Sequence, residues 1–140
     1  MKKRLVMLWL PAVLLLAAGC SKETELTGTS WYGSFQIQVE VSGYGQLDLL
    51  SEYTLVFESG TEGHILMKGT LTKQGATVYT EGQRSNFAYT FDGEKGELTL
   101  SGGKTNTFAY SKEVPTITVP VMSEEVLGHG VTHIVFRPME

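Results

Sequence analysis

The 140-residue sequence contains a single cysteine, Cys20, so no disulfide can form within one molecule and the fold must rest on its core. Positive charge is also scarce, because 11 lysines and arginines stand against 15 aspartates and glutamates. Three of those 11 are Lys2, Lys3 and Arg4, which leaves residues 20–140 with 8 positive and 15 negative side chains, a net charge of −7. This acidity repels phosphate backbones, so we expect no nucleic-acid partner.

The sequence after Cys20 also has little helical character, since no long window repeats its apolar residues every 3.6 positions. The best helical candidate is one turn at residues 123–128, where Ser123 would be the N-cap ahead of two acidic residues. Apolar and polar residues instead alternate, most regularly from Trp31 to Val41. A period of two is typical of strands with one buried face, so we expect an all-β domain.

Short alternating segments, most of them closed by glycine or Asp-Gly, predict eight or nine strands. These segments cover residues 31–41, 53–57, 64–72, 77–80, 86–91, 97–100, 105–110, 116–119 and 131–137. Residues 47–52 fit either a strand extension or a helical turn, Gly82 is expected to close a strand, and flanking prolines favour an edge strand at residues 116–119. Such strands avoid exposed edges most simply as a small antiparallel up-and-down barrel of about eight strands, here residues 29–140.

Residues 1–19 have the organisation of a signal peptide, with a basic start, an apolar run over residues 5–18 and small residues before Cys20. The run is shorter than the roughly 20 apolar residues that span a bilayer, and Pro11 interrupts it. Residues 16–20, Leu-Ala-Ala-Gly-Cys, resemble the lipobox of bacterial lipoproteins. The resemblance implies cleavage before Cys20, acylation of its thiol by fatty acids such as palmitate, and attachment to a membrane. The alternative is a lone thiol in an ordinary secreted chain.

Residues 20–28 would then be an acylated cysteine and a short flexible tether, because the residues after Cys20 are mostly polar and lack an apolar period. The residue after Cys20 is Ser21 and not aspartate, which resembles the pattern of lipoproteins that are sorted to the outer membrane. We therefore expect a lipid-anchored protein of the bacterial cell envelope. Residues 22–25, Lys-Glu-Thr-Glu, fit equally a surface-export signal, as in Bacteroidetes lipoproteins, and a solvated tether.

The sequence contains no recognised catalytic motif: it has no Gly-x-Ser-x-Gly elbow, no second cysteine and no carboxylate pair in a known spacing. We therefore expect no enzyme and no cofactor. His129 and His133 are four residues apart, which on a helix would suit a metal ion. Residues 131–136 are β-prone, however, and four residues of strand span about 13 Å. We expect no metal site, and His64 is expected to be a polar residue beside a turn.

Aromatic residues are the remaining feature that could serve a binding site. Most of them must fill the core, because a barrel of eight strands encloses little space. Tyr44, between two glycines, is expected to be exposed in a loop. The aromatic residues in phase on the expected strands are candidates to line the core or a ligand site: Trp31, Phe35, Tyr53, Phe57, Phe87, Tyr89, Phe91, Phe108 and Tyr110.

Residues 28–33, 53–57, 86–92 and 96–100 resemble the lipocalin-like domains of small Bacteroidetes lipoproteins. The resemblance covers residues 28–137 and implies an eight-stranded barrel in which a small apolar ligand is one option. Two functions stay open. The main expectation is a lipid-anchored module that binds a protein or glycan through its outer face or loops. The alternative is a small hydrophobic ligand inside the barrel, which a barrel filled by its own side chains would exclude.

Overall fold

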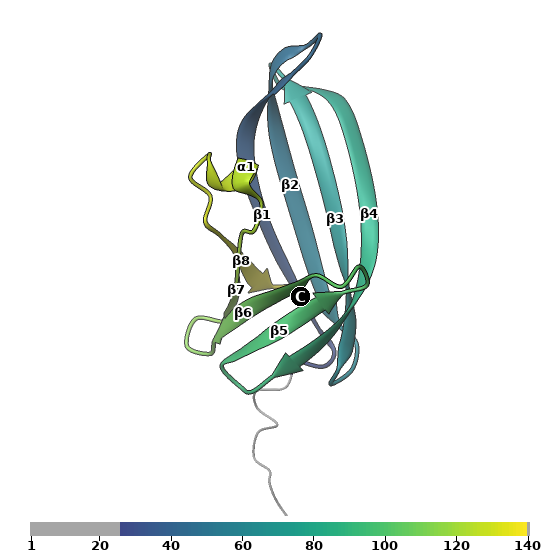
Figure 1. Cartoon of the computed structure of the whole chain (residues 1–140), viewed down its shortest axis with the longest axis vertical. Coiled ribbons are helices and arrows are strands. Elements are labelled where there is room, and N and C mark those ends of the chain that lie inside the picture. The colour runs from purple at the N-terminus through teal and green to yellow at the C-terminus, as the bar shows by residue number, and fades with distance from the viewer. Residues whose placement is uncertain (1–25, 140) are drawn as a thin grey trace, which may run out of the picture.

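In the computed structural model, which describes residues 26–139, the alternating segments form eight strands that pair antiparallel in chain order (Figure 1). They are β1 (Thr29–Val41), β2 (Gly45–Phe57), β3 (Glu62–Lys73), β4 (Ala76–Phe91), β5 (Lys95–Leu100), β6 (Thr105–Ser111), β7 (Thr116–Pro120) and β8 (His133–Pro138). A short helix, α1 (Glu124–Leu127), lies between β7 and β8. Because β1 also pairs with β8, the sheet closes into the up-and-down barrel that the sequence predicted.

Two details of the strands differ from the sequence-based expectation, and a third decides between two alternatives that the sequence left open. The expected strand end at Gly82 is wrong, because β4 runs through Gly82, which pairs with Lys68 of the long strand β3. Residues 47–52 are strand, not a helical turn. The segment at residues 116–119 is not an edge, since β7 pairs with β6 on one side and β8 on the other.

The eight strands have very different lengths, and this decides the shape of the barrel. β1 to β4 contain 13, 13, 12 and 16 residues, whereas β5 to β8 contain 6, 7, 5 and 6. β8 pairs with β1 only at Trp31 and Tyr32, and β5 pairs with β4 only from Phe87 to Phe91. The long strands therefore continue past the short ones as a four-stranded arm, residues 34–52 and 66–86 (Figure 1).

The end of the barrel opposite the arm, called the closed end here, is filled by aromatic side chains. Phe57 is fully buried at its centre, with its ring centroid 4.8 Å from that of Tyr89, 5.5 Å from that of Phe87 and 6.2 Å from that of Phe108. Trp31 is 4% exposed, and its indole Nε1 donates to Thr29 Oγ1 at 2.8 Å. Edge-to-face ring pairs contribute about 0.5–1.5 kcal/mol beyond their buried area. This cluster is therefore the main core of the domain.

The rings of this core need glycine on the neighbouring strand. A Cβ on Gly63 would lie 2.7 Å from Cζ of the Phe87 ring, and a Cβ on Gly96 would lie 2.7 Å from Cζ of Phe108. Both glycines are directly opposite these phenylalanines in the β-ladder. The absence of a side chain lets each ring lie flat over the backbone, and the sheet can bend sharply there.

The packed part of the chain begins before β1. Leu26, in the segment that the sequence assigned to a flexible tether, is 3% exposed and belongs to the core cluster with Phe57. The Gly28 amide donates to the carbonyl of Phe57 at 2.7 Å, and the Thr29 amide donates to the carbonyl of Leu26 at 3.1 Å. Residues 26–28 therefore seal the closed end of the barrel.

Replacement of Trp31 by alanine should destabilise the domain far more than the same change at Tyr32, its neighbour on the opposite face. Loss of a buried tryptophan leaves a cavity and costs about 3–5 kcal/mol. Tyr32 is 38% exposed, and its hydroxyl donates to Glu52 at the surface, so its loss should cost about 1 kcal/mol or less. Urea unfolding of the two variants measures the difference, and equal midpoints would show that the first strand is assigned to the wrong faces.

Gly96→Ala should destabilise the domain by about 1–3 kcal/mol, because the new methyl group overlaps the Phe108 ring and the backbone of β4. Gly69→Ala is the matched control in a strand, since the nearest atom to its added Cβ is Leu49 Cδ1 at 3.9 Å. The melting temperatures of both variants decide the point. A Gly96→Ala protein as stable as Gly69→Ala would mean that the rings do not need the glycines.

Candidate functional site

A cavity of about 190 Å³ lies inside the barrel, on the side of the aromatic core that faces the arm. Its floor and walls include Phe87, Leu98, Val119 and Phe136, which belong to the buried cluster below it. The remaining wall is formed by side chains on the inner face of the strands and by the chain after β7: Phe35, Tyr53, Leu55, Ile65, Leu100, Asn106, Pro120, Val121, Met122, Ser123, Val126 and Ile134. The barrel interior is therefore filled at one end and open at the other.

The connection between β7 and β8 covers this cavity. Val121, Met122 and Val126 line it, and the Val121 amide donates to the Thr132 carbonyl at 2.9 Å to close the base of the loop. Ser123 is the N-cap of α1, as the sequence predicted, and its side chain accepts from the Val126 amide. No residue of α1 is buried, and Met122 is 67% exposed. A segment with so little buried surface can open locally at low free-energy cost.

The cavity adjoins a groove of about 330 Å³ on the inner face of the arm. Tyr53 lines both, and its ring stacks on Phe35 with the centroids 6.1 Å apart. Burial raises the pKa of the Tyr53 hydroxyl above its usual 10.0, so the group is neutral near pH 7. The other residues that line the groove are apolar near β1 and more polar toward β4: Val39, Val41, Leu49, Ser51, Met67, Lys68, Gly69, Leu71, Tyr79, Glu81 and Gln83.

Few polar groups face the cavity. Asn106, on β6, lies in its wall, and within residues 26–139 its side chain makes no hydrogen bond. The Tyr53 side chain, which carries a hydroxyl, lines both the cavity and the groove, and Ser123 also lies in the cavity wall. An apolar site with a small number of polar groups is the usual composition of a pocket for a small molecule, in which the polar groups set the orientation of the ligand.

The structure divides the nine aromatic residues that the sequence proposed for the core or a ligand site. Three of them line the cavity: Phe35, Tyr53 and Phe87. The other six belong to the core or pack against it: Trp31, Phe57, Tyr89, Phe91, Phe108 and Tyr110. Cys20, the proposed lipid-attachment residue, lies outside the described residues. Tyr44 is 52% exposed at the tip of the first hairpin, as expected.

Sequence reasoning did not identify the aliphatic part of the site. Ile65 lies on the inner face of β3 and lines the cavity, but the candidate residues taken from the sequence were all aromatic. Leu98 and Val119 lie on short strands whose facing partners the sequence does not reveal. Met122 and Val126 lie in the β7–β8 connection, and no sequence pattern shows that this loop folds back over the barrel.

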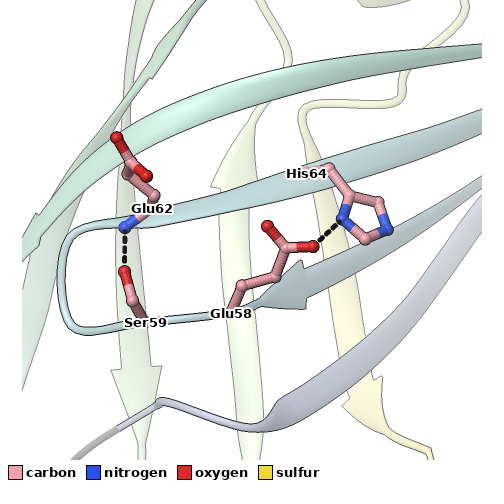
Figure 2. Close-up of polar contacts among 4 residues, drawn as sticks. All are labelled: Glu58, Ser59, Glu62 and His64. Carbon is pink, nitrogen blue, oxygen red and sulfur yellow. Dashed lines mark hydrogen bonds and ion pairs between the residues drawn. The ribbon is translucent and has the colours of Figure 1, made fainter.

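The hairpin between β2 and β3 contains a serine, a histidine and a glutamate in close sequence (Figure 2). His64 Nδ1 lies 2.9 Å from Glu58 Oε2, and the His64 side chain is 12% exposed. Ser59 Oγ, however, accepts from the Thr61 and Glu62 amides at 3.2 and 3.0 Å, and Figure 2 shows it on the turn, away from the imidazole. The hydroxyl thus stabilises the turn, and the three residues do not form a nucleophile–base–acid relay.

The remaining polar features of the described chain are spread over the surface. His129 and His133 are both exposed, and within residues 26–139 no three His, Cys, Asp or Glu side chains are close enough to hold a metal ion. Asp92 accepts from the Glu94 and Lys95 amides at 2.9 and 2.8 Å, and these hydrogen bonds lower the pKa of its carboxyl group. No helix in the described part is long and apolar enough to cross a membrane.

Comparisons of this chain with protein-family models, with curated proteins and with solved structures found no match.

Proposed function

We propose that the protein binds a small, mainly apolar molecule in the cavity above its aromatic core. The observation that supports this function is the half-filled barrel, in which the aromatic residues occupy the closed end and leave about 190 Å³ free above them. The sequence-based expectation placed a protein or glycan partner first and a small apolar ligand second, and it left open whether the interior was filled. The open cavity favours the alternative.

The size of the cavity limits the ligand class. An apolar cavity of about 150 Å³ in another protein holds one benzene molecule. A cavity of about 190 Å³ therefore suits one ring or a short alkyl chain, and the adjoining groove of about 330 Å³ can hold the rest of an elongated ligand. Asn106 and Tyr53 offer hydrogen bonds to a single hydroxyl, carbonyl or ester group. This role is binding, without a chemical step.

We further propose that the protein is a lipoprotein of the bacterial outer membrane, acylated at Cys20. Multiple acyl chains would make the anchorage effectively permanent. Leu26 packs at the closed end, and the six residues from Cys20 to Leu26 can span at most about 20 Å. The closed end would therefore lie near the bilayer, with the arm and the mouth of the cavity on the side away from it.

Ile65→Trp should weaken at least tenfold the binding of the uncharged fluorophore N-phenyl-1-naphthylamine to residues 21–140. Ile65 lines the cavity, and an indole at that position occupies the space that the ligand needs. Leu66→Trp is the matched control, because Leu66 is the next residue on the same strand, is 42% exposed and points outward. Fluorescence titration should show at least tenfold weaker binding for Ile65→Trp and unchanged binding for Leu66→Trp.

Circular dichroism and thermal unfolding of both variants show whether the barrel persists. If the folded Ile65→Trp protein binds the fluorophore as tightly as the unchanged protein does, the ligand is not in the cavity. If Leu66→Trp weakens binding to the same extent, the fluorophore occupies the outer surface instead.

Cys20→Ser should prevent acylation and leave the precursor uncut or slowly cut, because serine offers no thiol for the acyl chains. Cells that express the full chain are labelled with a radioactive or alkyne-bearing fatty acid, and the purified protein is examined for label. Ser21→Ala, one residue away, should be labelled normally. Label on the Cys20→Ser protein would exclude Cys20 as the attachment residue.

A further inference from the structure

The arm leaves one side of β4 without a neighbour. β5 pairs with β4 only from Phe87 onward, and every residue from Ala76 to Arg84 is exposed. At the far end, the register with β3 shifts between Leu71 and Thr72, which leaves Val78 without a paired residue. The free edge of β4 therefore runs from Tyr79 to about Ser85, and Gly82 is its midpoint.

The backbone groups on this edge can be assigned from the ladder. The Tyr89 amide donates to Thr61 just before β3, whereas the Asn86 carbonyl accepts from Ser101 just after β5. In an antiparallel ladder these directions alternate residue by residue, and the β3–β4 register is regular from Glu62 to Leu71. The amide and carbonyl of Thr80, Gly82 and Arg84 therefore point away from β3, along the free edge.

Unpaired edges of this kind invite another strand, and proteins usually block them with proline, charged side chains (lysine above all) or a bulge. Residues 79–85, Tyr-Thr-Glu-Gly-Gln-Arg-Ser, contain neither proline nor lysine, and the register shift lies outside them. The edge does contain two charged side chains, Glu81 and Arg84, but they have opposite signs, so they do not exclude a second strand of the same sequence.

We propose that the edge of β4 pairs with the edge of β4 of a second copy of this chain, antiparallel about Gly82. In this register Gly82 faces Gly82 of the partner subunit, Thr80 faces the partner's Arg84, and Arg84 faces the partner's Thr80. Each of these pairs exchanges both backbone hydrogen bonds. Glycine at the centre places no side chain on the two-fold axis.

The charges of the edge suit this register. On the inner face, the Glu81 carboxylate lies opposite the partner's Gln83, whose amide can donate to it, and no two like charges are directly opposed. The contact is isologous, so it closes as a dimer and does not extend into a fibre. The pairing ends at Tyr79, opposite the partner's Ser85, because the next residue, Val78, would face the partner's Asn86, whose carbonyl already accepts from Ser101 of its own chain. Residues 76–78 must therefore bend away from β5 of the partner subunit.

The pairing also changes the groove. Glu81 and Gln83 line it, and directly opposite residues in an antiparallel pair lie on the same face of the sheet. The partner's Gln83 and Glu81 therefore extend the polar side of each groove. The dimer would present two grooves side by side on one continuous sheet of eight strands, β1 to β4 from each copy.

Gly82→Pro tests the site of pairing, because it removes the backbone amide that would donate to the partner subunit. That amide bonds to no strand of its own copy, and proline is tolerated at such edge positions. Gln38→Pro is the matched control on β1, the other free edge of the arm. The Ser30 carbonyl accepts from the Met139 amide, so the backbone groups of the even-numbered residues of β1, including Gln38, also point away from β2. Light scattering of the full chain in detergent, with the protein mass separated from the detergent mass, should give two chains for the unchanged and Gln38→Pro proteins and one chain for Gly82→Pro.

The register has a test that does not depend on a proline variant. Full-length Glu81→Cys and Gln83→Cys proteins are mixed and oxidised, and disulfide-linked peptides are identified by mass spectrometry. Opposed residues of the non-hydrogen-bonded pair have Cα atoms about 4.5 Å apart, so the two variants should link to each other. Neither alone should link at position 81 or 83, since those Cα atoms would be more than about 7 Å apart.

A single-chain mass for the unchanged protein at every concentration reached would overturn the proposal. A dimer that persists in folded Gly82→Pro, or that is lost in Gln38→Pro and not in Gly82→Pro, would move the contact away from the β4 edge. Disulfides that form within Glu81→Cys alone and not between the two variants would overturn the register.

Discussion

The close approach of aromatic rings to strand glycines is the constraint on which the rest of the structure depends. Phe87 lies against Gly63 and Phe108 against Gly96, at distances that a methyl group would not allow. These contacts let short strands bend around a compact cluster centred on Phe57. Without a disulfide in the molecule, this cluster supplies most of the hydrophobic stabilisation of the barrel.

The aromatic cluster fills only one end of the barrel, and this leaves space at the other end. The rings fill the barrel where all eight strands are present, and the long strands carry the sheet beyond it. A cavity remains on the arm side of these rings, where aliphatic side chains such as Ile65 and Leu100 share the wall with Phe35 and Tyr53. The loop that contains α1 covers the cavity without burying any residue of the helix. The core and the candidate site therefore adjoin inside one barrel and share Phe87, Leu98, Val119 and Phe136.

The sequence predicted the fold class because its strongest signal, the alternation from Trp31 to Val41, is local. The sequence did not predict that β4 passes through Gly82. Pairing with Lys68 of β3 keeps Gly82 in an extended conformation, and the sequence does not show which strands pair. Three of the four aromatic residues in the cavity wall, Phe35, Tyr53 and Phe87, were among the predicted residues, and Phe136 was not. The cover formed by Met122 and Val126 was not, because the path of a loop across a barrel depends on long-range packing that no periodicity records.

The most direct test of a barrel filled at one end and open at the other is a crystal structure determined under xenon pressure, because xenon enters dry apolar cavities without a specific interaction. We expect a xenon atom between Ile65, Leu98 and Val119, and none among the rings around Phe57. An unoccupied cavity at that level, or xenon bound between Phe57 and Phe87, would contradict it.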